Sequence, residues 1–121
     1  MPRPPKCRLI ETLPEVTYFK PRGIPMTALE EIVLPVEGFE ALRLSELEGL
    51  DHDKASERMN VSRQTFGRIL ASARKALARA VVEGMALRID GGNFVVQGQG
   101  KETIKKKRRK AQMIRKVENQ S

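Results

Sequence analysis

The 121 residues are enough for one small domain with extensions, and their 4% aromatic and 40% hydrophobic content favours a modest helical core over a large β-sandwich. A formal net charge of +8 indicates a polyanionic partner, most often nucleic acid. No apolar run is long enough to span a bilayer, and the N-terminal residues lack the apolar stretch of a signal peptide.

Residues 1–25 are rich in proline, which disfavours helix at the proline itself and at the residue before it. We expect an extended basic arm in which residues 16–20, VTYFK, could pair as a short strand. The next segment, TALEEIVLP, begins with a capping box of Thr27 and Glu30 and reaches Pro35, so it predicts a short helix.

Residues 36–50 carry apolar side chains at helical spacing, and Gly49 is a natural stop for that helix. Asp51 then predicts an N-cap for a short helix over 53–59, and Asn60 tolerates the left-handed backbone of a tight turn. The predicted core face of the first of these helices consists of Phe39, Ala41, Leu42, Leu44, Leu47 and Leu50.

The longest predicted helix runs from Arg63 to about Glu83, after an N-cap at Ser62 and before Gly84. Gly67 costs this helix about 1 kcal/mol relative to alanine, which suggests a close approach at that position. The inner face shows apolar residues at spacings of three and four: Phe66, Ile69, Leu70, Ala73, Leu77, Ala80 and Val81.

Residues 86–96, ALRIDGGNFVV, are two apolar runs around an Asp-Gly-Gly-Asn turn, which predicts a β-hairpin. Residues 98–121 are strongly basic and have few apolar side chains, so we expect a flexible tail or a helix that forms on binding. The predicted fold class is mainly α, a helix-turn-helix bundle of about four helices over 26–97 that ends in the hairpin. The extended arm of 1–25 precedes this domain and the basic tail of 98–121 follows it.

Five positions favour a helix-turn-helix over two unrelated helices. This motif needs a small residue on its first helix, a tight turn, an apolar residue after the turn and an apolar inner face on its second helix. Those roles fall to Ser56, Asn60, Val61, Phe66 and Ile69. Alanine and glycine would be commoner at positions 56 and 60, so the match is good but not ideal.

Charge is segregated along the chain. Residues 1–22 hold five basic and two acidic residues, and 23–61 hold three basic and nine acidic ones. Residues 62–90 hold six basic and two acidic residues, and 91–121 hold nine and two. This segregation favours a protein with one face directed toward phosphates.

The candidates for reading bases are the outward residues near the start of the longest helix: Arg63, Gln64, Thr65 and Arg68. Arginine can bond guanine through two hydrogen bonds, and glutamine can do the same for adenine. The candidate phosphate contacts are hydroxyl or basic side chains of that helix, the arm and the tail: Ser62, Arg74, Lys75, Arg79, Arg3, Lys6, Arg8, Lys105, Lys106, Lys107, Arg108, Arg109 and Lys110. The alternative is a capped helix whose arginines are simply solvated.

The stretch from EALRLSELEGL through MNVSRQTFGRILASARKALA resembles the helix-turn-helix domain with which bacterial sigma factors read the upstream promoter element. This resemblance implies that Arg63, Gln64 and Arg68 face DNA. The early sigma domains are absent, so we do not expect a complete sigma factor.

A closer resemblance covers about residues 2–94. Through PRPPKCR, YFKPRGIP, LEEIVLPVEGFEALRLSELEGL, VSRQTFGRILASARKAL and LRIDGGNF, the chain is similar to a small prokaryotic family of predicted DNA-binding proteins of unknown function. That family implies a helix-turn-helix but no particular target, and the basic tail lies outside the resemblance.

We therefore expect a sequence-specific binder of double-stranded DNA that regulates transcription, in the cytoplasm at the nucleoid, and not an enzyme. With one cysteine and one histidine, the sequence supports no disulfide within the chain, no zinc site and no cofactor. A homodimer on paired half-sites fits this reading.

Two alternatives stay open. The chain could be an adaptor that holds RNA polymerase through its acidic stretch, residues 30–57. RNA binding is less favoured, because one tyrosine, four phenylalanines and no tryptophan offer few platforms for stacking bases.

Overall fold

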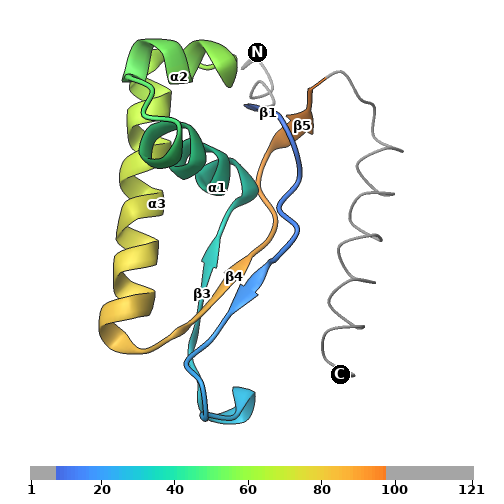
Figure 1. Cartoon of the computed structure of the whole chain (residues 1–121), viewed down its shortest axis with the longest axis vertical. Helices are drawn as coiled ribbons and strands as arrows, with labels where there is room; N and C mark the ends of the chain where they lie inside the picture. Colours follow the sequence, from blue (N-terminus) through green and yellow to red (C-terminus); the bar gives the residue numbers. More distant parts are fainter. Residues whose placement is uncertain (1–7, 98–121) are drawn as a thin grey trace, which may run out of the picture.

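A computed structural model describes residues 8–97 (Figure 1). Within them the chain forms three α-helices, two short non-α helical turns and five short strands. In chain order these are β1 (Arg8–Ile10), β2 (Tyr18–Phe19), the 3₁₀ turn η1 (Met26–Ala28), β3 (Glu31–Leu34), α1 (Val36–Leu42), the π-helical turn η2 (Arg43–Leu47), α2 (His52–Arg58), α3 (Arg63–Glu83), β4 (Ala86–Ile89) and β5 (Phe94–Val96). The expected mainly α class therefore holds only in part.

The strands form two small sheets beside α3. In the larger one, β4 is central, antiparallel to β2 and parallel to β3. Ile32 lies opposite Leu87 and Leu34 opposite Ile89, so these four side chains share the face that packs on α3. In the smaller sheet β1 runs parallel to β5, and the predicted strand at VTYFK is confirmed as β2.

Two apolar clusters fill the molecule. One lies between the sheets and α3 and includes Ile10, Leu34, Ala73 and Ile89. The other lies between α1, η2, α2 and α3: Ala41, Leu44, Ala55, Met59, Phe66 and Leu70. Figure 1 shows the corresponding arrangement, with α1 and α2 against the N-terminal half of α3 and strands β3 and β4 beside its C-terminal half.

The helix predicted over 27–35 is wrong. Only η1 is helical there, its N-cap makes no side-chain hydrogen bond, and Glu31–Leu34 is a strand. Pairing with β4 overrides the local capping pattern, and it suits the β-branched pair Ile32 and Val33. Pro35 also restricts Leu34 to an extended backbone.

The hairpin predicted over 86–96 is also wrong, because its two strands have different partners. β4 pairs with β2 and β3, whereas β5 pairs with β1. Gly91 and Gly92 have φ of 71° and 102°, and their loop crosses the start of α1 instead of reversing the chain. There the N–H of Val36 donates to the carbonyl of Gly91 at 3.1 Å, and the N–H of Asn93 donates to Glu37.

The described part of the expected N-terminal arm is extended but belongs to the core. Ile10 is only 1% exposed, and its carbonyl accepts from the N–H of Gln97 at 2.7 Å. The proline-rich composition shows that the segment is not helical, but it does not show which strand it pairs with. Residues 1–7 of the arm and the tail of 98–121 lie outside the described residues.

The other helices follow the prediction, except that three residues of their predicted apolar faces are exposed. α1 continues through η2 to Gly49, whose φ is 69°, but Leu47 is 84% exposed instead of buried. The π-helical turn changes the number of residues per turn and so moves Leu47 out of the apolar face. Leu77 and Val81 of α3 are 40% and 75% exposed, because α1 and α2 do not reach that half of the helix.

Candidate nucleic-acid interface

Helices α2 and α3 are joined by a tight connection whose ends are both capped. The Asp51 carboxylate accepts from the N–H of Lys54 at 2.8 Å at the start of α2. Asn60 adopts a left-handed backbone with φ of 55°, as predicted. The Ser62 hydroxyl accepts from the N–H of Thr65 at 3.0 Å and begins α3. The caps and the turn thus fix the direction in which α3 leaves α2.

The contact between the two helices is apolar and closely packed. Ser56 is buried, and its hydroxyl donates to the carbonyl of Asp53 at 3.0 Å, so this small polar side chain is satisfied inside α2. Met59 and Phe66 are fully buried, and the half-buried Val61 and Ile69 pack against them. The five residues predicted to form the helix-turn-helix contact therefore all lie in the turn or the interface between α2 and α3.

The predicted base-reading residues lie on the outer surface of the first turns of α3. Arg63, Gln64 and Arg68 are exposed, whereas Thr65 is half-buried and its hydroxyl accepts from Ser62 at 2.9 Å. Arg63 is 3.6 Å from Asp53 of α2, but both side chains are 70% exposed. An ion pair this exposed contributes little to stability. The Arg63 guanidinium can therefore exchange Asp53 for another partner with little loss of free energy.

The predicted phosphate contacts are more scattered than the base-reading set. Arg74 pairs with Glu46 of η2, and Arg79 pairs with Glu83 at 3.2 Å, so both charges are partly neutralised. Arg8 lies away from α3, beside Glu37 at 4.0 Å. The remaining predicted cations other than Lys75 lie outside the described residues: Arg3, Lys6, Lys105, Lys106, Lys107, Arg108, Arg109 and Lys110.

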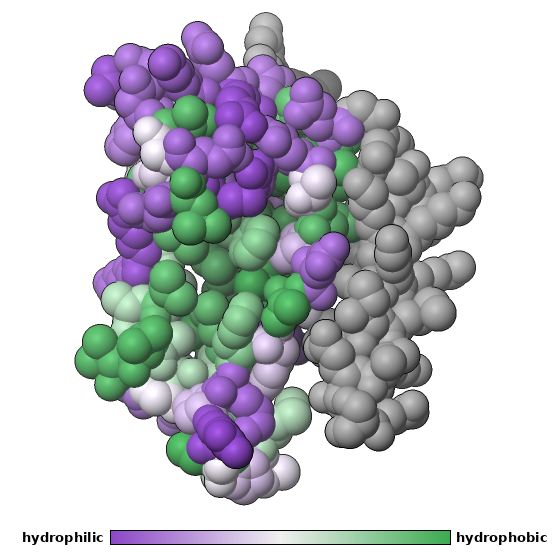
Figure 2. Space-filling view, in the orientation of Figure 1, coloured by the Kyte–Doolittle hydropathy of each residue, from purple (hydrophilic) through white to green (hydrophobic). Residues whose placement is uncertain are grey.

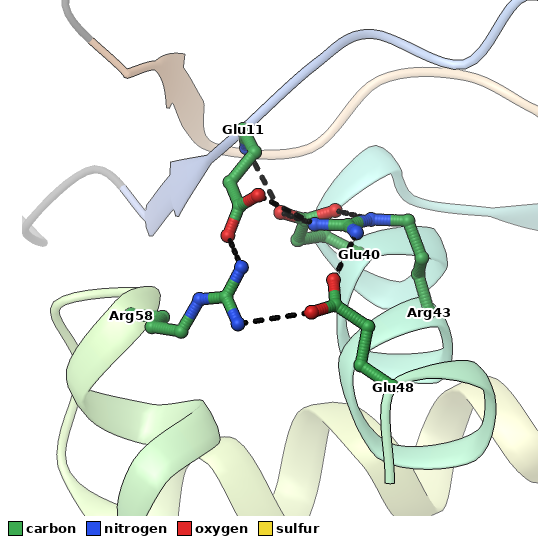
Figure 3. Close-up of polar contacts among 5 residues, drawn as sticks. All are labelled: Glu11, Glu40, Arg43, Glu48 and Arg58. Atoms are coloured by element: carbon green, nitrogen blue, oxygen red, sulfur yellow. Dashed lines mark hydrogen bonds and ion pairs between the residues drawn. The ribbon is translucent and has the colours of Figure 1, made fainter. Parts of the chain in front are cut away.

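A charge network that the sequence analysis missed holds α2 in place (Figure 3). Glu40 of α1 is 1% exposed, and the Arg43 guanidinium donates to its two carboxylate oxygens at 2.8 and 2.9 Å. The N–H of Glu11 also donates to Glu40 at 2.8 Å. Arg58 of α2 contacts Glu11 and Glu48, and Arg43 contacts Glu48 as well.

The network joins the segment after β1, α1, η2 and α2, so it fixes α2 against the rest of the fold. A hydrogen bond from an arginine favours the charged form of the carboxylate that accepts it, and this effect is resolved for Glu48. The hydrogen bond from Arg58 lowers the pKa of Glu48, and the bond to Glu40 raises the pKa of Arg43 further above its usual range. The spacing of Glu40 and Arg43, i to i+3, was a visible signal, but Glu11 and Arg58 come from distant segments.

Gly67 does not mark a tight contact between helices. A Cβ atom there would meet only the ring of His52, at 4.0 Å, while that ring stands edge-on to Phe66 with centroids 5.3 Å apart. The surface beside the predicted base-reading residues is therefore open at this position.

Over residues 8–97 no helix is long and apolar enough to cross a membrane. The same residues contain no cluster of three histidine, cysteine or carboxylate side chains that could hold a metal ion.

Comparison with known proteins places the chain among families without an assigned activity. Residues 1–97 match the family described as "Protein of unknown function DUF134". A UPF0251 protein of Pelotomaculum thermopropionicum is 60% identical over 94 residues, which cover 78% of this chain and 71% of that protein. A UPF0251 protein of Caldanaerobacter subterraneus is 54% identical over 99 residues, which cover 82% of this chain and 84% of the relative. No solved structure matches.

Proposed function

Because the chain belongs to the DUF134 family, whose description assigns no function, we propose a function from the site: sequence-specific binding of double-stranded DNA through a helix-turn-helix formed by α2 and α3. The observation that carries the proposal is the set of exposed polar side chains on the first turns of α3, Arg63, Gln64 and Arg68, opposite a buried apolar face. In this motif the N-terminal residues of the second helix contact base edges in the major groove.

Local energetics support this assignment. The single described contact of the Arg63 side chain is a weak exposed ion pair, and the side chains of Gln64 and Arg68 make no polar contact within residues 8–97. DNA would therefore replace mainly water around these groups. The charge network holds α2 in a fixed position, and α3 packs on α2 through a buried apolar contact. A motif that is already in place lowers the entropy lost on binding.

The adaptor alternative receives less support from the arrangement of the acidic stretch. Five of its carboxylates are already in ion pairs inside the domain: Glu31, Glu37, Glu40, Glu46 and Glu48. A surface whose charges are matched internally is a poor electrostatic target for a partner. RNA stacking is also disfavoured, because Phe66 is buried and Phe19 is the one described aromatic side chain that is more exposed than covered.

We further propose that the protein acts in transcription, with RNA polymerase and a second copy of the chain as candidate partners at the nucleoid. The basic tail would add contacts to phosphate that do not depend on base sequence. Selection from a pool of random duplexes at two salt concentrations tests the proposal. One enriched motif at both concentrations is the expected result, and a pool that stays random at both would refute it.

A further inference from the structure

A groove of about 470 Å³ lies between α3 and the edge of the larger sheet. Its floor is apolar and includes Ile32, Leu34, Ile69, Ala73 and Ala76. On the side formed by α3, the groove is lined by three basic side chains, which we call the cationic bank: Arg68, Lys75 and Arg79. Figure 2 shows apolar side chains gathered beside the lower half of α3, below the polar surface over α1 and α2.

The strand that borders the groove is an edge strand. In the order β2-β4-β3, β3 pairs on one side only among residues 8–97. The carbonyls of Glu30 and Leu34 accept from the N–H groups of Ala86 and Asp90 of the β4 segment, at 2.9 and 3.1 Å. Alternate residues of a strand direct their polar groups to opposite sides. The N–H and C=O of Val33 therefore point to the open side, and Val33 is 46% exposed.

The charges around the groove are predominantly positive. Glu37 lines the groove and accepts from the N–H of Asn93, and Arg79 pairs with Glu83, which does not line the groove. Arg68 and Lys75 form no ion pair within residues 8–97. Lys75 lies about 18 Å along the helix axis from Arg63, so it is well separated from the first turns of α3.

Charge excludes two occupants from the same chain. The terminal segments 1–7 and 98–121 are themselves basic, with two and nine basic residues against none and two acidic ones. A second copy paired through β3 would bring the same cationic bank of each copy toward the shared boundary. Duplex DNA would match the cations but would leave the apolar floor and the free strand edge unused.

We propose that β3 and the cationic bank of α3 form a docking site for an acidic, extended segment of a partner protein. The segment would add to the sheet as a strand beside β3, through the polar groups of Val33. Its apolar side chains would cover the groove floor, and its carboxylates would meet Lys75, Arg68 and Arg79. This inference does not rest on DNA binding, since Lys75 and Arg79 lie further along α3 and only Arg68, at the near end of the groove, also belongs to the proposed base-reading set.

The test uses the full chain and a fluorescent ten-residue peptide in which valine and glutamate take turns at every second position and serine fills the others, so that both valine and glutamate face α3 when the peptide adds to β3. A peptide of equal length with lysine in place of glutamate is the comparison. Anisotropy titration should show binding of the glutamate peptide alone. Lys75→Glu with Arg79→Glu should weaken that binding about tenfold and create binding of the lysine peptide. Lys54→Glu, an exposed change on α2, is the matched control and should leave both titrations unchanged.

Strand addition has its own measurement. Val33→Pro removes the outward N–H and should abolish peptide binding, whereas Val33→Thr keeps it and should bind normally. In the unaltered chain, the peptide should slow hydrogen exchange of the Val33 amide, a measurement that requires no variant.

Four results would overturn the proposal. The first is that the chain binds both peptides with equal affinity, or that it binds neither. The second is no effect of the charge reversal on the glutamate peptide. The third is a duplex that displaces the peptide and itself loses affinity in the charge-reversed variant, which would assign the groove to DNA. The fourth is a dimer in sedimentation that Val33→Pro dissociates, which would assign the edge to a second copy.

Discussion

Arg43 holds the buried carboxylate of Glu40 through two hydrogen bonds of 2.8 and 2.9 Å, one turn apart on the continuous helix of α1 and η2. Glu40 is 1% exposed, so its charge is compensated almost entirely by this guanidinium and by the N–H of Glu11. The pair links the helical layer to the segment after β1, and through Arg58 to α2.

Arg43→Ala should destabilise the fold by about 3–5 kcal/mol, because it leaves the Glu40 carboxylate buried without its partner. Urea unfolding followed by circular dichroism measures the change. Arg79→Ala is the matched control, since Arg79 pairs with Glu83 where both side chains are 51% exposed, and it should cost at most about 0.5 kcal/mol. Equal losses in the two variants would contradict the special role of the buried pair.

The Glu48 carboxylate should make the stability of the fold depend on pH in the acidic range. The hydrogen bond from Arg58 lowers its pKa in the folded state below the ordinary 4.5, so the unfolded chain binds the proton more readily. Its contribution is present above about pH 4.5 and is lost as the pH falls through the folded-state pKa. Glu48→Gln should therefore lower the melting temperature more at pH 7 than at pH 3.

The control for Glu48 is Glu57→Gln, because Glu57 is an exposed residue of α2 that forms no ion pair within residues 8–97. Its melting temperature should match that of the parent chain at both pH values. A Glu48→Gln deficit that persists undiminished at pH 3 would show that the side chain acts through packing and not through charge.

Substitution of two helical glycines by alanine should change the stability of the protein in opposite directions. Gly67→Ala should stabilise the protein by about 1 kcal/mol, since a Cβ there would meet only His52 at 4.0 Å. Gly38→Ala would place a Cβ 2.9 Å from Leu34 Cδ1 and 3.3 Å from Ala73 Cβ, where α1 packs on α3 and β3. Overpacking at that contact should offset the helical gain and lower stability. Thermal melts of both variants decide this, and a stabilising Gly38→Ala would show that Leu34 moves aside freely.

Local signals predicted the elements of the candidate site well. Asp51, Asn60, Ser62 and Gly84 act within one turn of their own position, so their caps and turns could be read from neighbouring residues. Helical periodicity likewise placed Phe66 and Leu70 inside.

Pairing between distant segments could not be read in this way. The segment around Ile32 and Val33 is a strand because Leu87 and Arg88 lie beside it, and the Gly91–Gly92 loop separates β4 from β5 because Glu37 lies beneath it. For the same reason the contact of Glu11 with Arg58, from segments 47 residues apart, had no local signal.

In the proposed DNA interface, α3 supplies base-sequence preference and the basic tail supplies affinity for any duplex. Variants of each element test this separation. Arg63→Ala and Gln64→Ala should each lower the preference for the selected motif by about 1–3 kcal/mol, because each removes one pair of hydrogen bonds to a base. Replacing residues 105–110 by alanine should instead weaken all duplexes alike and flatten the dependence of affinity on salt, because only phosphate contacts are lost. Fluorescence titrations of motif and scrambled duplexes at two salt concentrations measure both effects. If the alanine tail lowered motif preference while Arg63→Ala left it intact, the basic tail and not α3 would be the element that reads DNA.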